Sequence, residues 1–334
     1  MPVVLVGWEL VLWYNTDMES KDYSFVADRH TRRSFLAAGA CVLAAGGRIV
    51  SARETAIAAK PSGKVRFRVG MAGFTYARQS IDKTLVSMKR AGVHCLCVKD
   101  YHLPLDAKPA EIAAFRRKCA DHCVTPHGVG VIYIGSEDEA KRSFDYAAEL
   151  GVPVVVGAPW KPAADGSSDM RRRRQSPELC AKISDLCAKY DLKFAIHNHS
   201  RNPKTGWPEL FATPADAWDV VKDMDPRMGL CIDVAFAFAD GFDPSNEIRK
   251  YSSRLFDLHF RNISNPKDGL SCTDSTTGVI DYYRIVKTLA EVGYEGVCGI
   301  ELIRPFPKRS EWINTSVGYF KGLMDAVNRE NTKS

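Results

Sequence analysis

The sequence lacks the patterns that mark disulfide scaffolds, nucleic-acid-binding surfaces and membrane-spanning helices. Its 10 cysteines form no Cys-x-x-Cys pair, and 46 Lys and Arg residues against 40 Asp and Glu give a net charge of only +6. The basic residues are scattered and not interleaved with aromatic residues, so a nucleic-acid partner is not expected. The apolar run at residues 3–14 is too short for a transmembrane helix, which needs about 20 apolar residues.

What the sequence does contain is an alternation of short β-rich runs and longer helical stretches. With 334 residues and 45% hydrophobic content, the chain can bury the core of one large α/β barrel. The predicted strands cover residues 65–71, 94–99, 128–134, 152–157, 193–200, 228–234, 255–260 and 297–302. The predicted helices cover residues 79–91, 110–122, 137–150, 177–190, 213–221, 245–251, 280–292 and 311–328.

These strand–helix repeats predict a (β/α)8 barrel domain at residues 64–330. The alternative is an open, doubly wound sheet, which commonly carries Gly-x-Gly-x-x-Gly after its first strand. No such motif follows residues 65–71. The closed barrel is therefore the predicted fold.

Residues 1–60 predict an export signal and linker that precede the fold. The pair Arg32-Arg33 is followed by an apolar stretch that runs to Gly47, and then by Val50-Ser51-Ala52, an A-x-A-like cleavage site. This order resembles a twin-arginine signal and predicts a periplasmic protein without membrane association after cleavage. We expect translation to start at Met18, which leaves an ordinary polar region before the arginine pair.

The stretch Lys193 to Ser200, KFAIHNHS, is the first candidate for chemistry. Strand residues alternate between two faces, so His197 and His199 point the same way while Asn198 points the other. In a parallel barrel the shared face is the interior, and the C-terminal ends of the strands carry the active site. A pair of hydrogen-bonded core histidines is the alternative explanation.

Three later strands end in residues that are costly to bury without a partner. Asp233, His259 and Glu301 each stand at the C-terminal end of a predicted strand. Any one of them alone could be a capped or salt-bridged residue. Together with His197 they predict two imidazoles and two carboxylates around one divalent cation.

Five short motifs resemble the xylose isomerase-like sugar phosphate isomerases and epimerases, a family that includes D-tagatose 3-epimerase, hydroxypyruvate isomerase and inosose dehydratase. The resemblance runs from about Val65 to the end of the chain. The motifs are Ala195-Ile196-His197-Asn198-His199, Gly229-Leu230-Cys231-Ile232-Asp233, Leu255-Phe256-Asp257-Leu258-His259, Gly278-Val279-Ile280-Asp281 and Gly293-Tyr294-Glu295-Gly296. The family's Glu, Asp, His, Glu ligand set implies His197 in the first Glu position, then Asp233, His259 and Glu301.

The resemblance implies a sugar isomerase or epimerase that binds a hydroxy-carbonyl unit on one divalent metal and forms an enediolate. Glu301 is the carboxylate that matches the family's base positions. Because His197 replaces a carboxylate, the ligand set carries a charge of about −2 instead of −3, which should make the ion a stronger Lewis acid. The mixed nitrogen and oxygen donors favour Mn, Co, Fe or Zn over Mg or Ca. The same change makes two-base epimerisation less favourable than isomerisation or β-elimination.

Departures from the family pattern leave two other functions open. Ala235-Phe236 stands where relatives often have Gly-His, and Arg261-Asn262 where they often have Lys-Asp. The chain could therefore be a lyase that cleaves 3-keto glycosides, or a sugar-binding relative without turnover. A DNA-repair nuclease of the same barrel is less favoured, because it needs more strand-end metal ligands. The sequence indicates no oligomeric state.

Further candidates surround the predicted metal site. His199 and Lys99 are candidate catalytic residues, with a surface pair to Asp100 as the alternative for Lys99. His102 is a candidate second proton donor or substrate clamp. The remaining candidate substrate-binding residues are Trp160, Phe236 and Arg261, which could offer aromatic faces and a positive charge to a sugar.

Overall fold

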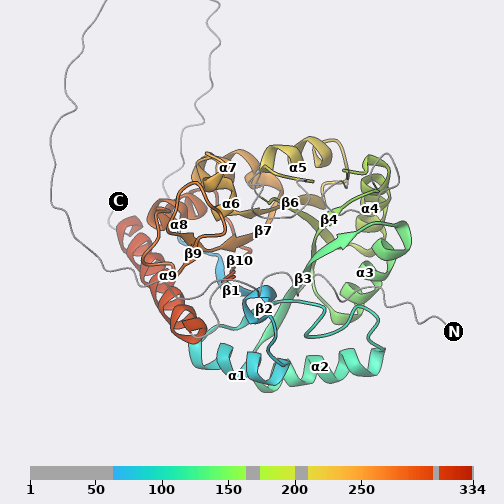
Figure 1. Cartoon of the computed structure of the whole chain (residues 1–334), viewed down its shortest axis with the longest axis horizontal. Helices are drawn as coiled ribbons and strands as arrows, with labels where there is room; N and C mark the ends of the chain where they lie inside the picture. The colour runs from blue at the N-terminus through green and yellow to red at the C-terminus, as the bar shows by residue number, and fades with distance from the viewer. Residues whose placement is uncertain (1–62, 163–173, 200–209, 304–307, 333–334) are drawn as a thin grey trace, which may run out of the picture. The chain divides into compact units, whose positions relative to one another are not determined.

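The structure is a computed structural model that describes residues 63–162, 174–199, 210–303 and 308–332. Within these ranges the chain forms a barrel of strands surrounded by helices (Figure 1). The predicted export signal at residues 1–60, with its arginine pair and the expected start at Met18, lies outside the described residues. No helix in the described ranges combines the length and the apolar character needed to cross a membrane.

Eight parallel strands close the barrel in the order β1, β10, β7, β6, β5, β4, β3 and β2, which confirms the predicted (β/α)8 fold. The strands are β1 Arg68–Ala72, β2 Cys95–Val98, β3 Thr125–Ile134, β4 Val154–Pro159, β5 Lys193–His197, β6 Met228–Asp233, β7 Leu255–Phe260 and β10 Val297–Ile300. The barrel closes where β1 pairs with both β10 and β2. Two unpredicted short strands, β8 Asn262–Ile263 and β9 Cys272–Thr273, form a separate antiparallel pair after β7.

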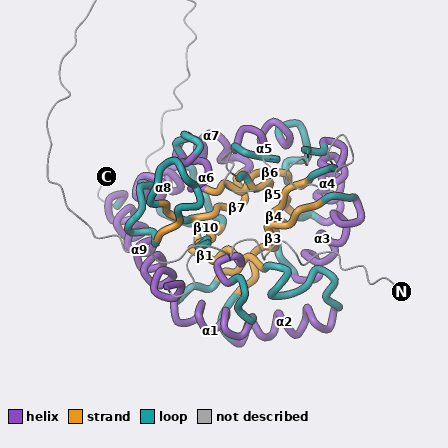
Figure 2. The backbone as a smooth tube through the Cα atoms, viewed as in Figure 1, coloured by secondary structure: helices purple, strands orange, loops and turns teal. Residues whose placement is uncertain are grey.

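Helices form the outer ring around the strands (Figure 2). They are α1 Ile81–Ala91, α2 Pro109–Asp121, α3 Glu137–Leu150, α4 Pro177–Tyr190, α5 Pro214–Val221, α6 Val234–Ala239, α7 Pro244–Tyr251, α8 Tyr282–Glu291 and α9 Arg309–Asn331, with 3-10 turns η2 Gly73–Tyr76 and η5 Ser252–Arg254. The predicted cap of α4 is confirmed: Ser176 accepts a hydrogen bond from the backbone N–H of Leu179, and Pro177 is the first helical residue. Helix α6 was not expected from the sequence.

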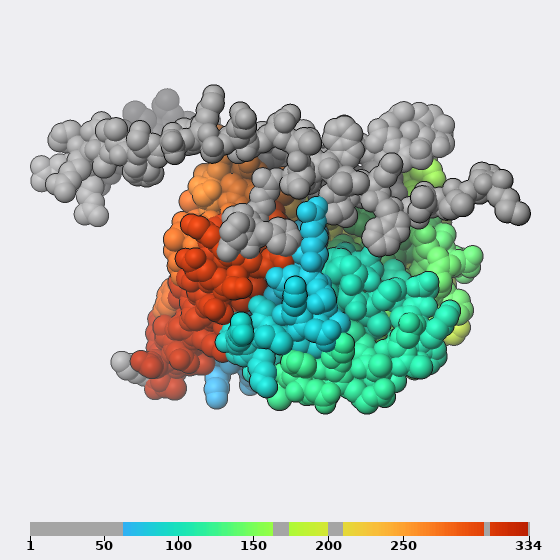
Figure 3. Space-filling view, turned by 60° about the horizontal axis from the view of Figure 1, so that its bottom comes forward, coloured from blue at the N-terminus to red at the C-terminus, as the bar shows by residue number. Residues whose placement is uncertain are grey.

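The last helix closes the ring beside the first. Figure 3 shows the red surface of α9 next to the cyan surface of α1. The Lys321 ammonium of α9 donates a hydrogen bond to the carbonyl of Gly92, the residue that ends α1 (2.9 Å). This contact joins the first and last helices of the barrel domain. The ring of helices therefore closes where the first and last strands of the barrel pair.

The interior of the barrel holds small side chains. Cys97, Val154, Val156, Ala195 and Cys231 form a buried cluster of their own, separate from the core between strands and helices. Strand alternation places the next inward residues, such as His197 after Ala195 and Asp233 after Cys231, one layer nearer the C-terminal ends. The fold thus collects polar side chains above an apolar interior layer.

Candidate active site

The four predicted metal ligands come together at the C-terminal end of the barrel. The donor atoms of His197, Asp233, His259 and Glu301 all lie within 4.8 Å of one another, and all four residues are buried. His197 Nε2 lies 2.9 Å from His259 Nδ1 and 4.0 Å from Asp233 Oδ2. His259 Nδ1 lies 3.4 Å from Glu301 Oε2.

Asp233 is held from both sides, so that one of its oxygens is left for the cluster. It ends β6 and caps α6, because its Oδ1 accepts hydrogen bonds from the backbone N–H groups of Ala235 (2.9 Å) and Phe236 (3.0 Å). Its own N–H donates to Oδ1 of Asn198 on the neighbouring chain segment (2.9 Å). The side chain of Asn198, which the strand alternation directs away from His197 and His199, therefore helps to position Asp233.

Glu301 is positioned by a threonine that the sequence does not single out. Thr75, a fully buried residue of η2, donates from Oγ1 to the carbonyl of Ile300 (2.8 Å) and accepts from the N–H of Leu302 (2.9 Å). The N–H of Glu301 itself donates to the carbonyl of Phe260 (2.9 Å). The backbone around the carboxylate is thereby anchored to η2 and to β7.

Arg261, predicted to bind substrate, contacts the ligand set instead of extending from it. Its Nε and Nη2 lie 3.1 Å and 3.0 Å from Oδ2 of Asp233, and its Nε lies 3.8 Å from Oε2 of Glu301. Its Nη1 donates to the carbonyl of Gly269, and the guanidinium lies 4.0 Å from the ring centre of Phe236. The positive charge of Arg261 therefore offsets part of the negative charge expected for the ligands.

Burial and neighbouring charges set the protonation of the ligands. Burial works to lower the pKa of His259, but the Glu301 carboxylate and the two nearby aspartates outweigh it and raise that pKa to about 9. Burial works to raise the pKa of Glu301, but His259 and Arg261 outweigh it and lower that pKa. In the absence of a metal, His259 is thus an imidazolium and Glu301 a carboxylate at neutral pH.

The other two ligands differ from this pair. Burial, followed by the charges of His259 and His199, holds the pKa of His197 well below its usual range, so His197 is a neutral imidazole. Burial raises the pKa of Asp233, and the attraction of Arg261 offsets this only in part. Of the two carboxylates, Glu301 is therefore the one whose negative charge its surroundings favour.

The donor set fits a divalent metal ion. With metal–ligand bonds of about 2.1 Å, adjacent donors of an octahedral site lie about 3.0 Å apart and opposite donors about 4.2 Å apart. The observed separations of 2.9, 3.4 and 4.0 Å fall in this range. These separations involve Nε2 of His197 and Nδ1 of His259. The other nitrogen of each ring has no hydrogen-bond partner within the described ranges, so each buried imidazole keeps an unsatisfied nitrogen. Two imidazoles and two carboxylates would hold an ion that accepts both nitrogen and oxygen ligands.

Aromatic side chains line one side of the cluster. The ring of His199 lies 4.7 Å from that of His197 and 5.4 Å from that of Phe236, and its Nε2 lies 3.3 Å from the hydroxyl of Tyr133. Burial lowers the pKa of His199 to about 4, so its imidazole is neutral at pH 7. Tyr133, which the sequence interpretation missed, extends this wall from β3.

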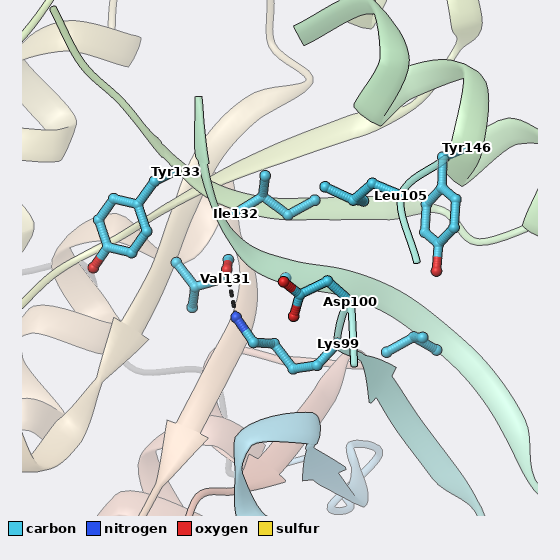
Figure 4. A pocket seen from close by; sticks show the side chains of 9 residues that line it. Lys99, Asp100, Leu105, Val131, Ile132, Tyr133 and Tyr146 are labelled. Carbon is cyan, nitrogen blue, oxygen red and sulfur yellow. Dashed lines mark hydrogen bonds between the residues drawn. The ribbon is translucent and has the colours of Figure 1, made fainter. Parts of the chain in front are cut away.

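Lys99 lies in a cavity between β2 and β3. Figure 4 shows its side chain reaching to the carbonyl of Val131, to which Nζ donates a hydrogen bond of 2.8 Å. The cavity has a volume of about 260 Å³ and is lined in part by Asp100, Tyr133 and Tyr146. Because Tyr133 also contacts His199, this cavity adjoins the wall of the candidate site.

The side chain of His102 contacts helix α1 and not the four candidate ligands. After β2 the chain turns, so His102 no longer follows the strand alternation, and its Nε2 pairs with the hydroxyl of Thr84 in α1 (3.3 Å). Burial lowers its pKa to about 4. Trp160 lies against the end of β3, where a Cβ on Gly135 would come within 2.4 Å of the indole. The structure thus brings His199 and Phe236 to the four ligands and gives His102 and Trp160 other neighbours.

The sequence profile of the family described as the xylose isomerase-like TIM barrel matches residues 86–323. The chain belongs to this family. The matched range contains all four candidate ligands and most of the barrel. A comparison with curated proteins found no match in sequence.

Several solved structures of xylose isomerase-like barrels and their relatives share the fold. A D-psicose 3-epimerase with D-tagatose, from Clostridium cellulolyticum H10, is 17% identical with a TM-score of 0.57, over 80% of this chain and 97% of that chain. The IolI protein with a bound zinc atom is 18% identical with a TM-score of 0.60, over 79% and 99%. A Bacillus anthracis protein described as the probable 3-DHS dehydratase AsbF is 11% identical with a TM-score of 0.59, over 76% and 99%.

Proposed function

We propose that this protein is a divalent-metal-dependent isomerase or epimerase that acts on a sugar or keto-sugar. The observation that carries the proposal is the buried set His197, Asp233, His259 and Glu301, with donor atoms within 4.8 Å of one another. These residues would hold one ion, which would polarise the carbonyl of a hydroxy-carbonyl unit and acidify the neighbouring C–H. The mixed nitrogen and oxygen donors favour Mn, Co, Fe or Zn over Mg.

Glu301 is the proposed base. Its pKa is lowered by His259 and Arg261 after the opposing effect of burial, so a carboxylate is present at neutral pH. Thr75 fixes the backbone on both sides of it, which holds the carboxylate in one position. Glu301 would take the proton from the carbon next to the carbonyl and could exchange it with solvent. Protonation of the adjacent carbon, together with transfer of the hydroxyl proton to the former carbonyl oxygen, would complete an isomerisation.

The second side of the substrate would face imidazole and aromatic groups. His197 occupies the position of the family's other carboxylate and is neutral, so it does not act as a second carboxylate base. His199 is neutral as well, and Lys99, which lines the adjoining cavity, contributes an ammonium group. These groups favour isomerisation with one carboxylate base over epimerisation with two.

A lyase that cleaves 3-keto glycosides is the second candidate. It uses the same removal of a C–H proton by Glu301, after which the enolate expels a leaving group from the next carbon instead of accepting a proton. Two points support this candidate: the export that we propose below, and the dehydratase description of one protein with the same fold. A sugar-binding protein without turnover is the remaining alternative.

Solvent exchange tests these functions together. Protein loaded with Mn²⁺ is incubated with a panel of keto-sugars in heavy water, and the products are followed by NMR and mass spectrometry. We expect deuterium at the carbon next to the carbonyl, lost in Glu301→Gln and kept in Glu247→Gln, a buried carboxylate of α7 that serves as the matched control. Release of a sugar fragment would identify the lyase, and tight sugar binding without deuterium would refute catalysis.

We also propose that the protein is exported through the twin-arginine route. Support comes from Arg32-Arg33 and the apolar and small-residue segments that follow. Replacement of both arginines by lysine should leave the protein in the cytoplasmic fraction with its signal uncleaved. Normal periplasmic recovery of this variant would contradict the proposal.

A further inference from the structure

A second group of metal-ligating side chains lies deeper inside the barrel. Cys97, His127 and Asp257 are all buried, and one ligand atom of each lies within 4.8 Å of the other two. They come from β2, β3 and β7, so they join strands on different sides of the barrel. Asp257 precedes His259 by two residues on β7, which places the group about 7 Å below the first site along the strand.

Two strand irregularities occur at this group. Between β2 and β3 the register passes from Leu96 opposite Pro126 to Cys97 opposite Gly128, which leaves His127 as an extra residue. Between β6 and β7 it passes from Leu230 opposite Leu255 to Cys231 opposite Asp257, which leaves Phe256 as an extra residue. Bulges of this kind redirect side chains. Both bulges therefore affect residues of this cluster: His127 is itself the extra residue of the first bulge, and Asp257 directly follows Phe256, the extra residue of the second.

Most polar atoms of the cluster lack ordinary partners among the described residues, although Oδ1 of Asp257 accepts a hydrogen bond from the backbone N–H of Leu258 (2.9 Å). Within the described ranges neither ring nitrogen of His127 has a hydrogen-bond partner, and Oδ2 of Asp257 has none either. His127 is 6% exposed and Asp257 1% exposed, so solvent does not satisfy them. Among the described residues, the sulfur of Cys97 has only a long contact of 3.9 Å to the carbonyl of Gly130. Buried polar groups without partners are rare in folded proteins, which points to a ligand.

The spacing and the charges suit a cation better than a hydrogen bond. His127 Nε2 and Asp257 Oδ2 are 3.7 Å apart, too far for a hydrogen bond. Nitrogen and oxygen donors on a tetrahedral zinc ion, with bonds of about 2.0–2.2 Å, lie about 3.3 Å apart. A thiolate and a carboxylate together balance the two positive charges of the ion, which an apolar interior requires.

We infer that Cys97, His127 and Asp257 form a second, thiolate-containing site for a divalent cation of the zinc class, beneath the first site. It differs from the first site in donor chemistry, because the first set offers only nitrogen and oxygen. The ion would link β2 and β3 to β7 across the barrel interior, and so stabilise the closed barrel. This site does not depend on the reaction proposed above.

Cobalt spectroscopy tests the inference. The apoprotein is prepared in a Cys123→Ser background, which removes the exposed cysteine of the described residues, and is then titrated with Co²⁺. We expect two ions per chain and a thiolate-to-cobalt charge-transfer band in the near ultraviolet. Cys97→Ser should lose the band and one ion per chain. Zn²⁺ should raise the Tm of the parent protein more than that of this variant.

Cys231→Ser is the matched control, because Cys231 is also buried inside the barrel and lies near His197 and His259. It should keep the band. If the band disappears in Cys231→Ser and persists in Cys97→Ser, the thiolate belongs to the first site and the inference is wrong. It is also wrong if the parent protein binds one ion without a band. Should Cys97→Ser not fold, Asp257→Asn provides the same test through stoichiometry and a changed band.

Discussion

Thr75→Val is the most informative test of how the barrel holds its candidate base. Valine has nearly the same shape as threonine, so the change leaves no cavity but removes the fully buried hydroxyl that binds Ile300 and Leu302. The carbonyl and the N–H that lose their partner cost about 1–3 kcal/mol each. The added methyl group returns about 0.8 kcal/mol. We therefore expect the free energy of unfolding to fall by about 1–5 kcal/mol.

Thr288→Val is the control, because it makes the same substitution at a fully buried threonine of α8. The Thr288 hydroxyl has no hydrogen-bond partner in the described part of the chain, so its replacement should cost nothing or stabilise slightly. Both variants are unfolded in urea and followed by circular dichroism, and Mn²⁺ affinity is measured by calorimetry. Thr75→Val should also weaken Mn²⁺ binding by about 10–100-fold, because the Glu301 backbone is released. Equal stabilities and equal affinities for the two variants would refute the role assigned to Thr75.

Three further predictions concern charge and hydrogen bonding at the site. Because the pKa of His259 is raised to about 9 in the metal-free protein, Mn²⁺ binding at pH 7 should release about one proton, and the affinity for Mn²⁺ should rise with pH up to about 9. Calorimetric binding heats that do not vary with the ionisation enthalpy of the buffer would contradict this. Arg261→Met should destabilise the metal-free protein by about 3–5 kcal/mol and strengthen Mn²⁺ binding, whereas Arg261→Lys should change the Mn²⁺ affinity less. Weaker Mn²⁺ binding in a folded Arg261→Met protein would show that the guanidinium does not compete with the ion. Asn262→Asp introduces the residue common in the family. It should lower the free energy of unfolding by about 1–3 kcal/mol without raising activity, because the Asn262 amide donates a hydrogen bond to the carbonyl of Ser275 (3.0 Å). Higher activity in this variant would show that Asn262 limits the reaction.

Much of the fold could be predicted from the sequence, because the signals for it are local. The alternation of β-rich and helical periodicity identified the barrel, and Ser176-Pro177 marked the start of a helix. The four strand-end ligands were also accessible, since parallel strands in a closed barrel bring their C-terminal ends together. The short helix α6 was missed because it is set by the cap of Asp233 and not by periodicity.

The sequence by itself therefore determined the barrel and the convergence of His197, Asp233, His259 and Glu301, because spacing along each strand decides which face and which end a residue occupies. Only the tertiary structure decided which partners those residues have. The pairing of Arg261 with Asp233 and the bonds of Thr75 around Glu301 join residues 28 and more than 220 positions apart. The approach of His127 to Asp257 depends in addition on two β-bulges. A register shift of one residue between two strands cannot be predicted from the residue pattern of either strand alone.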